Sequence, residues 1–147
     1  MTANTSINPL LLAAAISSFI ASALHVGILF GGANWLRFFG AGEAMAQMAE
    51  RGEVYPYVVT LIIASVLFVW GLYALKGAGL IQFLPLPLLR LGLLAIALVF
   101  IIRGLVIVPA LLGFAQFSGA FWVITSAICL SIGMFYAIGL AQKWGQI

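Results

Sequence analysis

Four long apolar stretches dominate this 147-residue chain and most constrain its fold. They are expected at about Pro9–Phe30, Val54–Leu75, Leu86–Val108 and Phe117–Gln142. About 20 apolar residues in a helix span the hydrocarbon core of a bilayer, and a helix satisfies its own backbone hydrogen bonds there. The sequence therefore predicts an all-α integral membrane protein. Its four transmembrane helices would form one bundle domain over residues 1–147.

The composition supports a membrane protein and excludes several other classes. Charged residues make up 6% of the chain and hydrophobic residues 65%, whereas a soluble domain carries about a quarter charged residues. The formal net charge of +3 is spread thinly, unlike the clustered Lys and Arg of a nucleic-acid interface, so no nucleic-acid partner is expected. With Cys129 as the single cysteine, an intrachain disulfide is excluded, and we expect no metal and no cofactor.

The first apolar stretch has some features of a secretory signal peptide. Leu10–Ile20 has the length of its apolar region, and Ala21-Ser22-Ala23 fits a cleavage motif. The preceding segment, Met1–Pro9, contains no Lys or Arg, which a signal peptide carries at this place. We therefore expect the segment to be an uncleaved first span.

The connection between the first and second spans contains an amphipathic pattern, Gly42–Arg51 (GEAMAQMAER). At helical spacing Met45, Met48 and Ala49 share one face. The polar side chains lie elsewhere on the helix surface: Glu43, Gln47 and Glu50. This pattern is typical of a helix that lies flat on a bilayer. A short interfacial helix is therefore expected at about residues 42–51.

Basic residues divide evenly between the two sides of such a protein. With the N-terminus in the cytoplasm, the inner side would hold Lys76, Arg90 and Lys143, and the outer side Arg37, Arg51 and Arg103. Arg103 lies within a span, so it counts less toward the orientation than a cation in a loop. All three acids lie in the first connection, although acids contribute little to this rule. We expect a multi-pass protein of the bacterial inner (cytoplasmic) membrane with both termini in the cytoplasm.

Arg103 is the only charged residue between Leu91 and Phe114. A cation in hydrocarbon is costly, so it snorkels, pairs, or serves a ligand or an ion pathway. A helix that starts near Leu86 places Arg103 about 25 Å along a core of about 30 Å, just below one interface. Its forked donors suit an anionic headgroup or substrate. The structural alternative is snorkelling or an ion pair with a glutamate of the first connection.

His25 and Glu53 are expected near the same interface as Arg103. His25 follows Ser18 and Ser22 on one helix face and should point into the bundle. In a functional role, His25 would titrate or contact a ligand. In a structural role, it would be a neutral imidazole that is hydrogen-bonded to a neighbouring helix. Glu53 starts the second span, where it stabilises the helix dipole, pairs with Arg103 or accepts a proton. With a loop aromatic as its cap, the predicted ligand site comprises His25, Arg103, Glu53 and Trp35.

No Walker loop, HExxH, GxSxG or dinucleotide motif occurs in the sequence, so an enzyme is not favoured. We expect a membrane protein that contacts membrane lipids and binds a lipid-like or other hydrophobic small molecule, or that supports a homo-oligomer or larger membrane complex. The first alternative is an oligomeric transporter or exporter subunit, with His25 and Glu53 carrying protons, although no acid lies deep within a span. The second alternative is a membrane enzyme that acts on a lipophilic substrate.

Several short motifs carry a resemblance to other proteins. They are Leu24-His25, Gly31-Gly32, Trp35 with Phe38-Phe39-Gly40, and Arg103-Gly104. The pattern resembles small bacterial inner-membrane proteins of unknown function with four predicted spans, and it extends over most of the chain. The resemblance implies no activity and assigns no site residue.

Overall fold

Helices are the only regular secondary structure in the part of the chain that the computed structural model describes, residues 6–117 and 119–147. Four segments within it are long and apolar enough to cross a membrane: α1 (Pro9–Phe38), α3 (Tyr55–Ala78), α4 with α5 (Leu89–Leu111) and α6 (Ala120–Lys143). The predicted all-helical fold and its four apolar helices are confirmed. Residues 1–5, ahead of the first span, and Ser118, in the expected fourth span, lie outside the described residues.

Helix α1 contains a break at Gly32, beyond the expected end of the first span at Phe30. Gly32 has φ 64° and ψ −149°, so the helix that continues to Phe38 is interrupted there. Glycine permits this positive φ because it has no Cβ. At 1.5 Å per residue, the helix from Pro9 to Gly31 is about 34 Å long, close to the thickness of a hydrocarbon core. The break therefore comes where a spanning segment of this length would end.

The third apolar stretch forms two helices. α4 (Leu89–Gly104) is followed by a turn and by the short helix α5 (Ile107–Leu111). Pro109 falls in the first turn of α5, where its missing N–H has no partner to lose. Pro109 therefore neither ends nor kinks α4, because α4 has already ended at Gly104.

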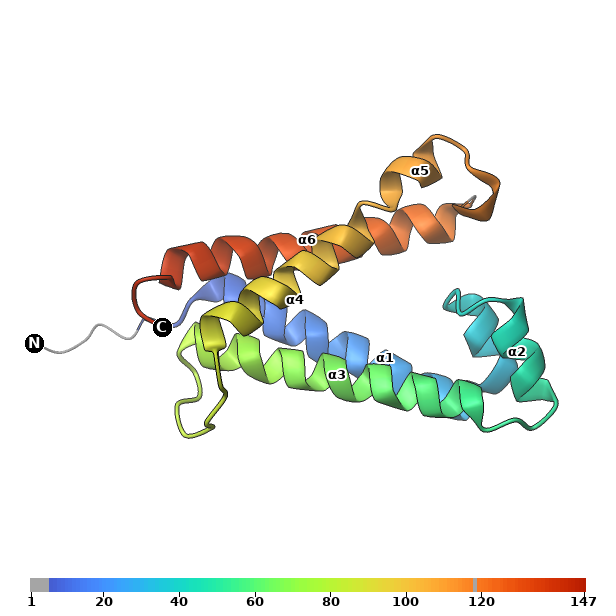
Figure 1. Cartoon of the computed structure of the whole chain (residues 1–147), viewed down its shortest axis with the longest axis horizontal. Coiled ribbons are helices and arrows are strands. Elements are labelled where there is room, and N and C mark those ends of the chain that lie inside the picture. The colour runs from blue at the N-terminus through green and yellow to red at the C-terminus, as the bar shows by residue number, and fades with distance from the viewer. Residues whose placement is uncertain (1–5, 118) are drawn as a thin grey trace, which may run out of the picture. The chain divides into compact units, whose positions relative to one another are not determined.

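The chain divides into two compact units. The terminal unit comprises the residues up to Ser17 together with Trp70–Ile147. It contains the start of α1, the end of α3, and α4, α5, the 3-10 helix η1 (Ala115–Phe117) and α6. The central unit comprises Ser18–Val69, with the remainder of α1 and α3 and the short helix α2 (Glu43–Glu50). Figure 1 labels the helices along the chain.

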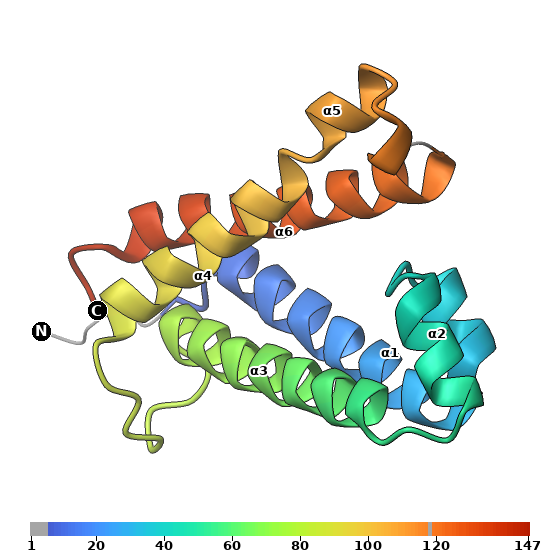
Figure 2. The same cartoon turned by 45° about the vertical axis from the view of Figure 1, so that its right-hand side comes forward.

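Two glycines allow α4 and α6 of the terminal unit to approach closely. A Cβ at Gly104 would lie 2.7 Å from the Cα of Leu130, and a Cβ at Gly133 would lie 2.9 Å from the backbone N of Ile101. The two helices accordingly run side by side in both Figure 1 and Figure 2. Helices in a bilayer associate through such small-residue contacts, because lipid tails are as apolar as the helices themselves.

The core of the terminal unit lies where the ends of several helices meet. Leu11 of α1, Leu93 of α4 and Tyr136 of α6 are fully buried. The Tyr136 hydroxyl donates a 2.9 Å hydrogen bond to the carbonyl of Trp70 in α3. Its ring stacks on that of Phe100 in α4, with centroids 5.8 Å apart. Tyr136 therefore joins α6 to both α3 and α4.

Helices α1 and α3 lie antiparallel in the central unit. The Ser22 hydroxyl of α1 donates a 2.7 Å hydrogen bond to the carbonyl of Ala64 in α3. One turn earlier on α1, the ring of Phe19 lies 5.3 Å from that of Phe68. A hydroxyl thus fixes the register of two otherwise apolar faces.

Helix α2 covers the end of α1 in the central unit. Ala46 is fully buried against Ile28 and Leu36, with Ala49 and Phe39 beside them. The polar residues of α2 are exposed: Glu43, Gln47 and Glu50. Ala46 and Ala49 of α2 therefore have a protein partner, whereas Met45 and Met48 are only partly buried. A place of α2 at the membrane interface stays a prediction.

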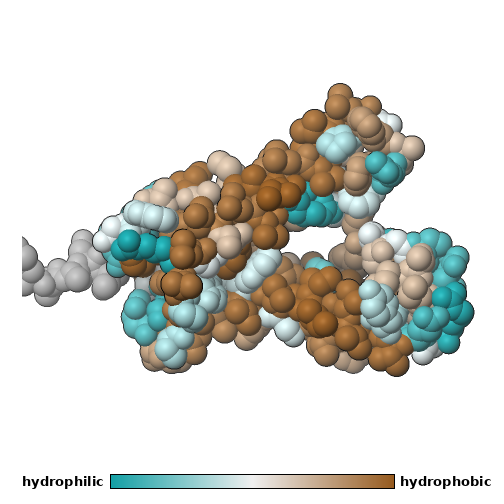
Figure 3. Space-filling view, viewed as in Figure 1, coloured by the Kyte–Doolittle hydropathy of each residue, from teal (hydrophilic) through white to brown (hydrophobic). Residues whose placement is uncertain are grey.

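Large apolar side chains cover much of the outer surface. Hydrophobic residues spread over α4 and α5 in the terminal unit and over α3 in the central unit, whereas α2 carries hydrophilic ones (Figure 3). Ile102 of α4 and Ile62 of α3 are 64% and 58% exposed. Soluble monomers rarely expose apolar patches this extensive.

Candidate functional site

The Arg103 side chain lies along helix α6 of the terminal unit. Its Nη1 donates a hydrogen bond to the Ser126 hydroxyl at 3.1 Å, and its Nη2 donates one to the Thr125 hydroxyl at 3.3 Å. The guanidinium carbon lies 5.2 Å from the ring centroid of Trp122, within cation–π range. Two hydroxyls and one aromatic ring therefore hold the guanidinium in one orientation.

The close contact between α4 and α6 explains this geometry. Arg103 lies in the last turn of α4, directly before the glycine at which the helices touch. Trp122, Thr125 and Ser126 share one face of α6, since Thr125 and Ser126 follow Trp122 by three and four residues. The Thr125 hydroxyl donates its own proton to the Phe121 carbonyl at 2.8 Å. Its lone pairs are therefore directed to accept from the guanidinium.

Arg103 has no carboxylate partner in the terminal unit, because the described residues of that unit include no Asp or Glu. A guanidinium carries five N–H donors, and two neutral hydroxyls accept only part of this capacity. The negative end of the α4 dipole favours a cation in its last turn. The partly buried charge is thus oriented by its neighbours but not neutralised by them.

His25 bonds within its own helix. Its Nδ1 lies 2.8 Å from the carbonyl of Ala21, one turn earlier in α1. In the tautomer that donates from Nδ1 to this carbonyl, Nε2 is left as an acceptor. The sequence had suggested a partner on a neighbouring helix as the structural alternative, whereas this bond is to α1 itself.

Trp35 lies on the backbone of α1 in the central unit. A Cβ at Gly31 would lie 2.0 Å from Cγ of the Trp35 ring, and a Cβ at Gly27 would lie 2.9 Å from Cζ3. The ring therefore covers both glycines, across the break at Gly32. Trp35 therefore stabilises the end of α1 near the break. Trp35 is nevertheless 43% exposed.

Glu53 pairs with a neighbour in the loop before α3. Its carboxylate accepts a 2.7 Å hydrogen bond from Nε of Arg51. The two other glutamates of the chain, Glu43 and Glu50, both accept 2.7 Å hydrogen bonds from the Arg37 guanidinium. Each glutamate of the central unit therefore has an arginine from the same unit.

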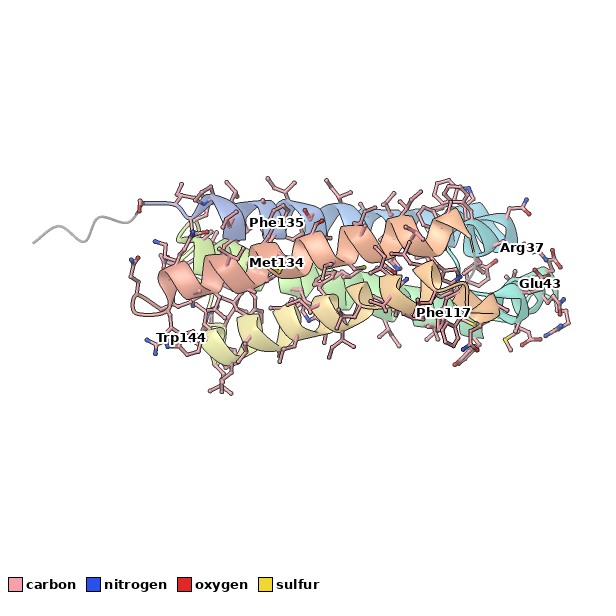
Figure 4. The ribbon with its side chains drawn as sticks, turned by 90° about the horizontal axis from the view of Figure 1, so that it is seen from above. Arg37, Glu43, Phe117, Met134, Phe135 and Trp144 are labelled. Carbon is pink, nitrogen blue, oxygen red and sulfur yellow. The ribbon has the colours of Figure 1, made fainter. Side chains whose placement is uncertain are left out.

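The Arg37 pairs tie the end of α1 to both ends of α2. Figure 4 labels Arg37 and Glu43 close to each other. Hydrogen bonds from Arg37 hold the pKa of the Glu43 carboxyl below its ordinary value. Both carboxylates are exposed, so solvent screening weakens these pairs. Their role is to orient α2 rather than to bury charge.

The central unit also has an apolar hollow of about 530 Å³. It is lined by Phe19, Ser22, Ala23, Val26 and Phe68. The Ser22 hydroxyl is directed to the Ala64 carbonyl. The hollow therefore offers apolar contact and no free polar group from Ser22.

The four predicted site residues divide between the two units. Arg103 lies in the terminal unit, whereas His25, Trp35 and Glu53 lie in the central unit, each with a local partner. A pocket that combines all four stays a prediction.

Sequence reasoning missed the residues that hold Arg103. Trp122, Thr125 and Ser126 were not singled out, although an aromatic residue followed three and four residues later by hydroxyls marks one polar face on an apolar helix. This pattern could have indicated that the face binds a polar group. The sequence alone did not indicate which helix would supply the cation.

A comparison of the chain with protein-family models, with curated proteins and with solved structures finds no match. The resemblance to small four-span bacterial proteins therefore stays an expectation from the sequence. Functional inference depends on the geometry of the site.

Proposed function

We propose that this chain is a four-span membrane protein that binds a lipid-like molecule with an acidic headgroup at Arg103. One observation carries the proposal: a partly buried guanidinium in an apolar helix is oriented by two hydroxyls and an indole, without a carboxylate from its unit. A charged side chain within a membrane helix is costly, by up to about 3 kcal/mol at the bilayer centre. An acidic ligand would offset this cost.

The depth of Arg103 is compatible with such a ligand. At 1.5 Å per residue, Arg103 lies about 21 Å from the start of α4 at Leu89, in the last turn of a helix that is about 24 Å long. Its guanidinium would lie below one interface, where a long side chain extends toward headgroups. Phosphate and carboxylate oxygens match the forked donors of a guanidinium.

The surroundings of Arg103 suit the apolar part of an amphiphile. Ile102 and Leu105, on either side of it in the chain, are 64% and 51% exposed. An acyl chain along α4 would cover these side chains while its headgroup contacts the guanidinium. This combination of an apolar surface with one placed polar group is typical of small-molecule sites.

We further propose that the protein lies in the bacterial inner membrane with both termini in the cytoplasm. Arg37 and Arg51, in the central unit, are paired with glutamates. The loop cations of the terminal unit have no acidic side chain within that unit: Lys76, Arg90 and Lys143. Lys and Arg near span ends favour the cytoplasmic side.

Recovery of bound lipid tests the Arg103 site. Protein purified in mild detergent is expected to retain an acidic amphiphile that native mass spectrometry detects. Arg103→Ala should reduce its occupancy about tenfold or more, since a charge-assisted hydrogen bond contributes roughly 1.5–3 kcal/mol. Arg103→Lys should retain part of it, because lysine keeps the charge without the fork. Arg51→Ala is the matched control and should leave occupancy unchanged.

Cys129 provides a second readout without engineering. It is the only cysteine of the chain and lies one turn after Ser126 on α6. Added phosphatidic acid or oleate should slow maleimide labelling of Cys129 in the natural protein but not in Arg103→Ala. Stable protein that retains no amphiphile, and whose labelling neither probe slows, would contradict the proposal and leave Arg103 a structural residue.

A further inference from the structure

The ends of four helices converge at the end of the terminal unit where residues 6–8 meet α6. The Asn8 side chain donates a 2.7 Å hydrogen bond to the Gln142 side chain, and the Asn8 N–H donates to the Ala78 carbonyl at 3.0 Å. The Tyr73 hydroxyl donates to the Pro87 carbonyl at 3.1 Å. The start of α1, the end of α3, the segment before α4 and the end of α6 therefore form one surface.

This surface carries three cations from three helices. Lys76 lies in the last turn of α3, Arg90 in the first turn of α4, and Lys143 at the end of α6. We call them the cationic end. They belong to a unit whose sequence contains no acid, whereas every glutamate of the chain lies in the central unit and pairs with an arginine there.

The contacts of these cations divide them into two kinds. Lys143 is 8% exposed and donates to the Ser6 carbonyl at 2.8 Å and to the Gln146 side chain at 2.9 Å. It therefore anchors the chain before α1. Lys76 is partly buried and donates to the Leu84 carbonyl, whereas Arg90 is exposed and its Nε donates to the Ile147 carbonyl. Both keep further donors for a ligand, because an ammonium has three N–H groups and a guanidinium has five.

An aromatic residue accompanies Arg90. Its guanidinium carbon lies 5.7 Å from the ring centroid of Trp144, which is 45% exposed. Trp144 follows α6 directly and is labelled in Figure 4. Tryptophan beside basic residues at the end of a membrane-length helix is typical of the headgroup layer. An acidic headgroup in this layer would contact the Arg90 guanidinium beside the Trp144 ring.

We propose that the cationic end binds anionic phospholipid headgroups, with Arg90 and Lys76 as the contacts and Trp144 at the headgroup level. The positions favour lipid over an acidic protein, because these cations lie at the ends of helices of membrane-spanning length. A basic residue near an anionic leaflet contributes about fivefold to lipid binding. The surface is separate from the Arg103 site and does not rest on it.

Fluorescence of Trp144 gives a local test. The protein and its Trp144→Phe variant are reconstituted in bilayers that mix phosphatidylglycerol and phosphatidylcholine, with one or the other brominated. The difference between the two proteins reports quenching at Trp144. We expect brominated phosphatidylglycerol to be preferred over brominated phosphatidylcholine by roughly 10-fold or more, with the preference falling in high salt.

Charge variants identify the residues responsible. Arg90→Gln should lower the preference by about fivefold, and Lys76→Gln with Arg90→Gln should bring it near parity. Arg51→Gln, at an exposed cation of the central unit, is the matched control. Arg103→Ala should keep the preference, so the two proposals fail separately. Absence of any preference in the natural protein, or the same preference in the double variant, would overturn the inference and favour an acidic protein partner.

Discussion

Gly104 is the residue on which the geometry at Arg103 most directly depends. It brings α4 against the backbone of α6, where a Cβ would meet the N, Cα and Cβ of Leu130 at 2.7 Å. The neighbouring Arg103 is thereby placed over Thr125 and Ser126. A side chain at position 104 cannot be accommodated by a rotamer change, because backbone atoms are in the way.

Gly104→Ala should therefore separate the two helices and weaken the Arg103 site. Overpacking of this kind costs roughly 1–3 kcal/mol. We expect a lower thermal transition in detergent and reduced retention of bound amphiphile, both measurable on one preparation. Gly145→Ala is the control, since a Cβ there meets nothing within 4 Å. Equal behaviour of the two variants would show that the contact does not matter.

At the scale of elements, α2 is the helix whose place depends most on charge. Its small apolar face packs on Ile28 and Leu36, and its two ends are held through Glu43 and Glu50 by Arg37. Eight residues are too few to form a stable isolated helix. Packing and the two ion pairs therefore carry its stability together.

Acid should loosen α2. The pKa of Glu43 is lowered in the folded protein, mainly by the hydrogen bond from Arg37. Its contribution to stability is thus present above the ordinary glutamic acid pKa of about 4.3 and is lost as the pH falls through the lower folded value. Hydrogen exchange of α2 amides, corrected for intrinsic rates, should show less protection at pH 3.5 than at pH 6.

A variant separates this effect from general acid sensitivity. Glu43→Gln should reduce protection of α2 at pH 6 and flatten its pH dependence, whereas Glu53→Gln, which removes the pair with Arg51, should leave α2 largely unchanged. Identical pH profiles for the natural protein and Glu43→Gln would assign the effect to another group.

At the scale of the whole molecule, charge is divided unevenly between the two units. The terminal unit holds four of the six basic residues and no acid, and the central unit holds two arginines and all three glutamates. Both central arginines pair with glutamates. That both termini face the cytoplasm stays a proposal, because counting Lys and Arg alone leaves the two sides equal.

Cysteine accessibility measures this orientation. In a Cys129→Ser background expressed in a bacterial host, Gln146→Cys should react with a membrane-impermeant maleimide only from the cytoplasmic side. Gln47→Cys should react only from the opposite side. Reversed labelling would overturn the orientation but keep four spans, and labelling of both positions from one side would overturn the proposed threading.

Much of the helical structure could be predicted from the chain, but the site could not. Long apolar runs indicate helices in any arrangement, because their backbone bonds are satisfied within each helix. The break at Gly32 and the end of α4 at Gly104 were not predicted, since other glycines of this chain, such as Gly92 and Gly133, lie within continuous helices. For Arg103, the sequence suggested glutamate partners, whereas its hydrogen bonds are to two hydroxyls of α6.

By itself, the sequence determined that this protein is helical, that four of its segments have the length and composition to cross a membrane, and that Arg103 is an exception within one of them. Only the tertiary structure decided which side chains surround that exception. The physical reason is that faces toward lipid and faces toward protein are equally apolar in such helices, so hydrophobicity does not select the partner. The close contacts at Gly104 and Gly133 make α6 the partner of α4. They thereby place Thr125 and Ser126 beside Arg103.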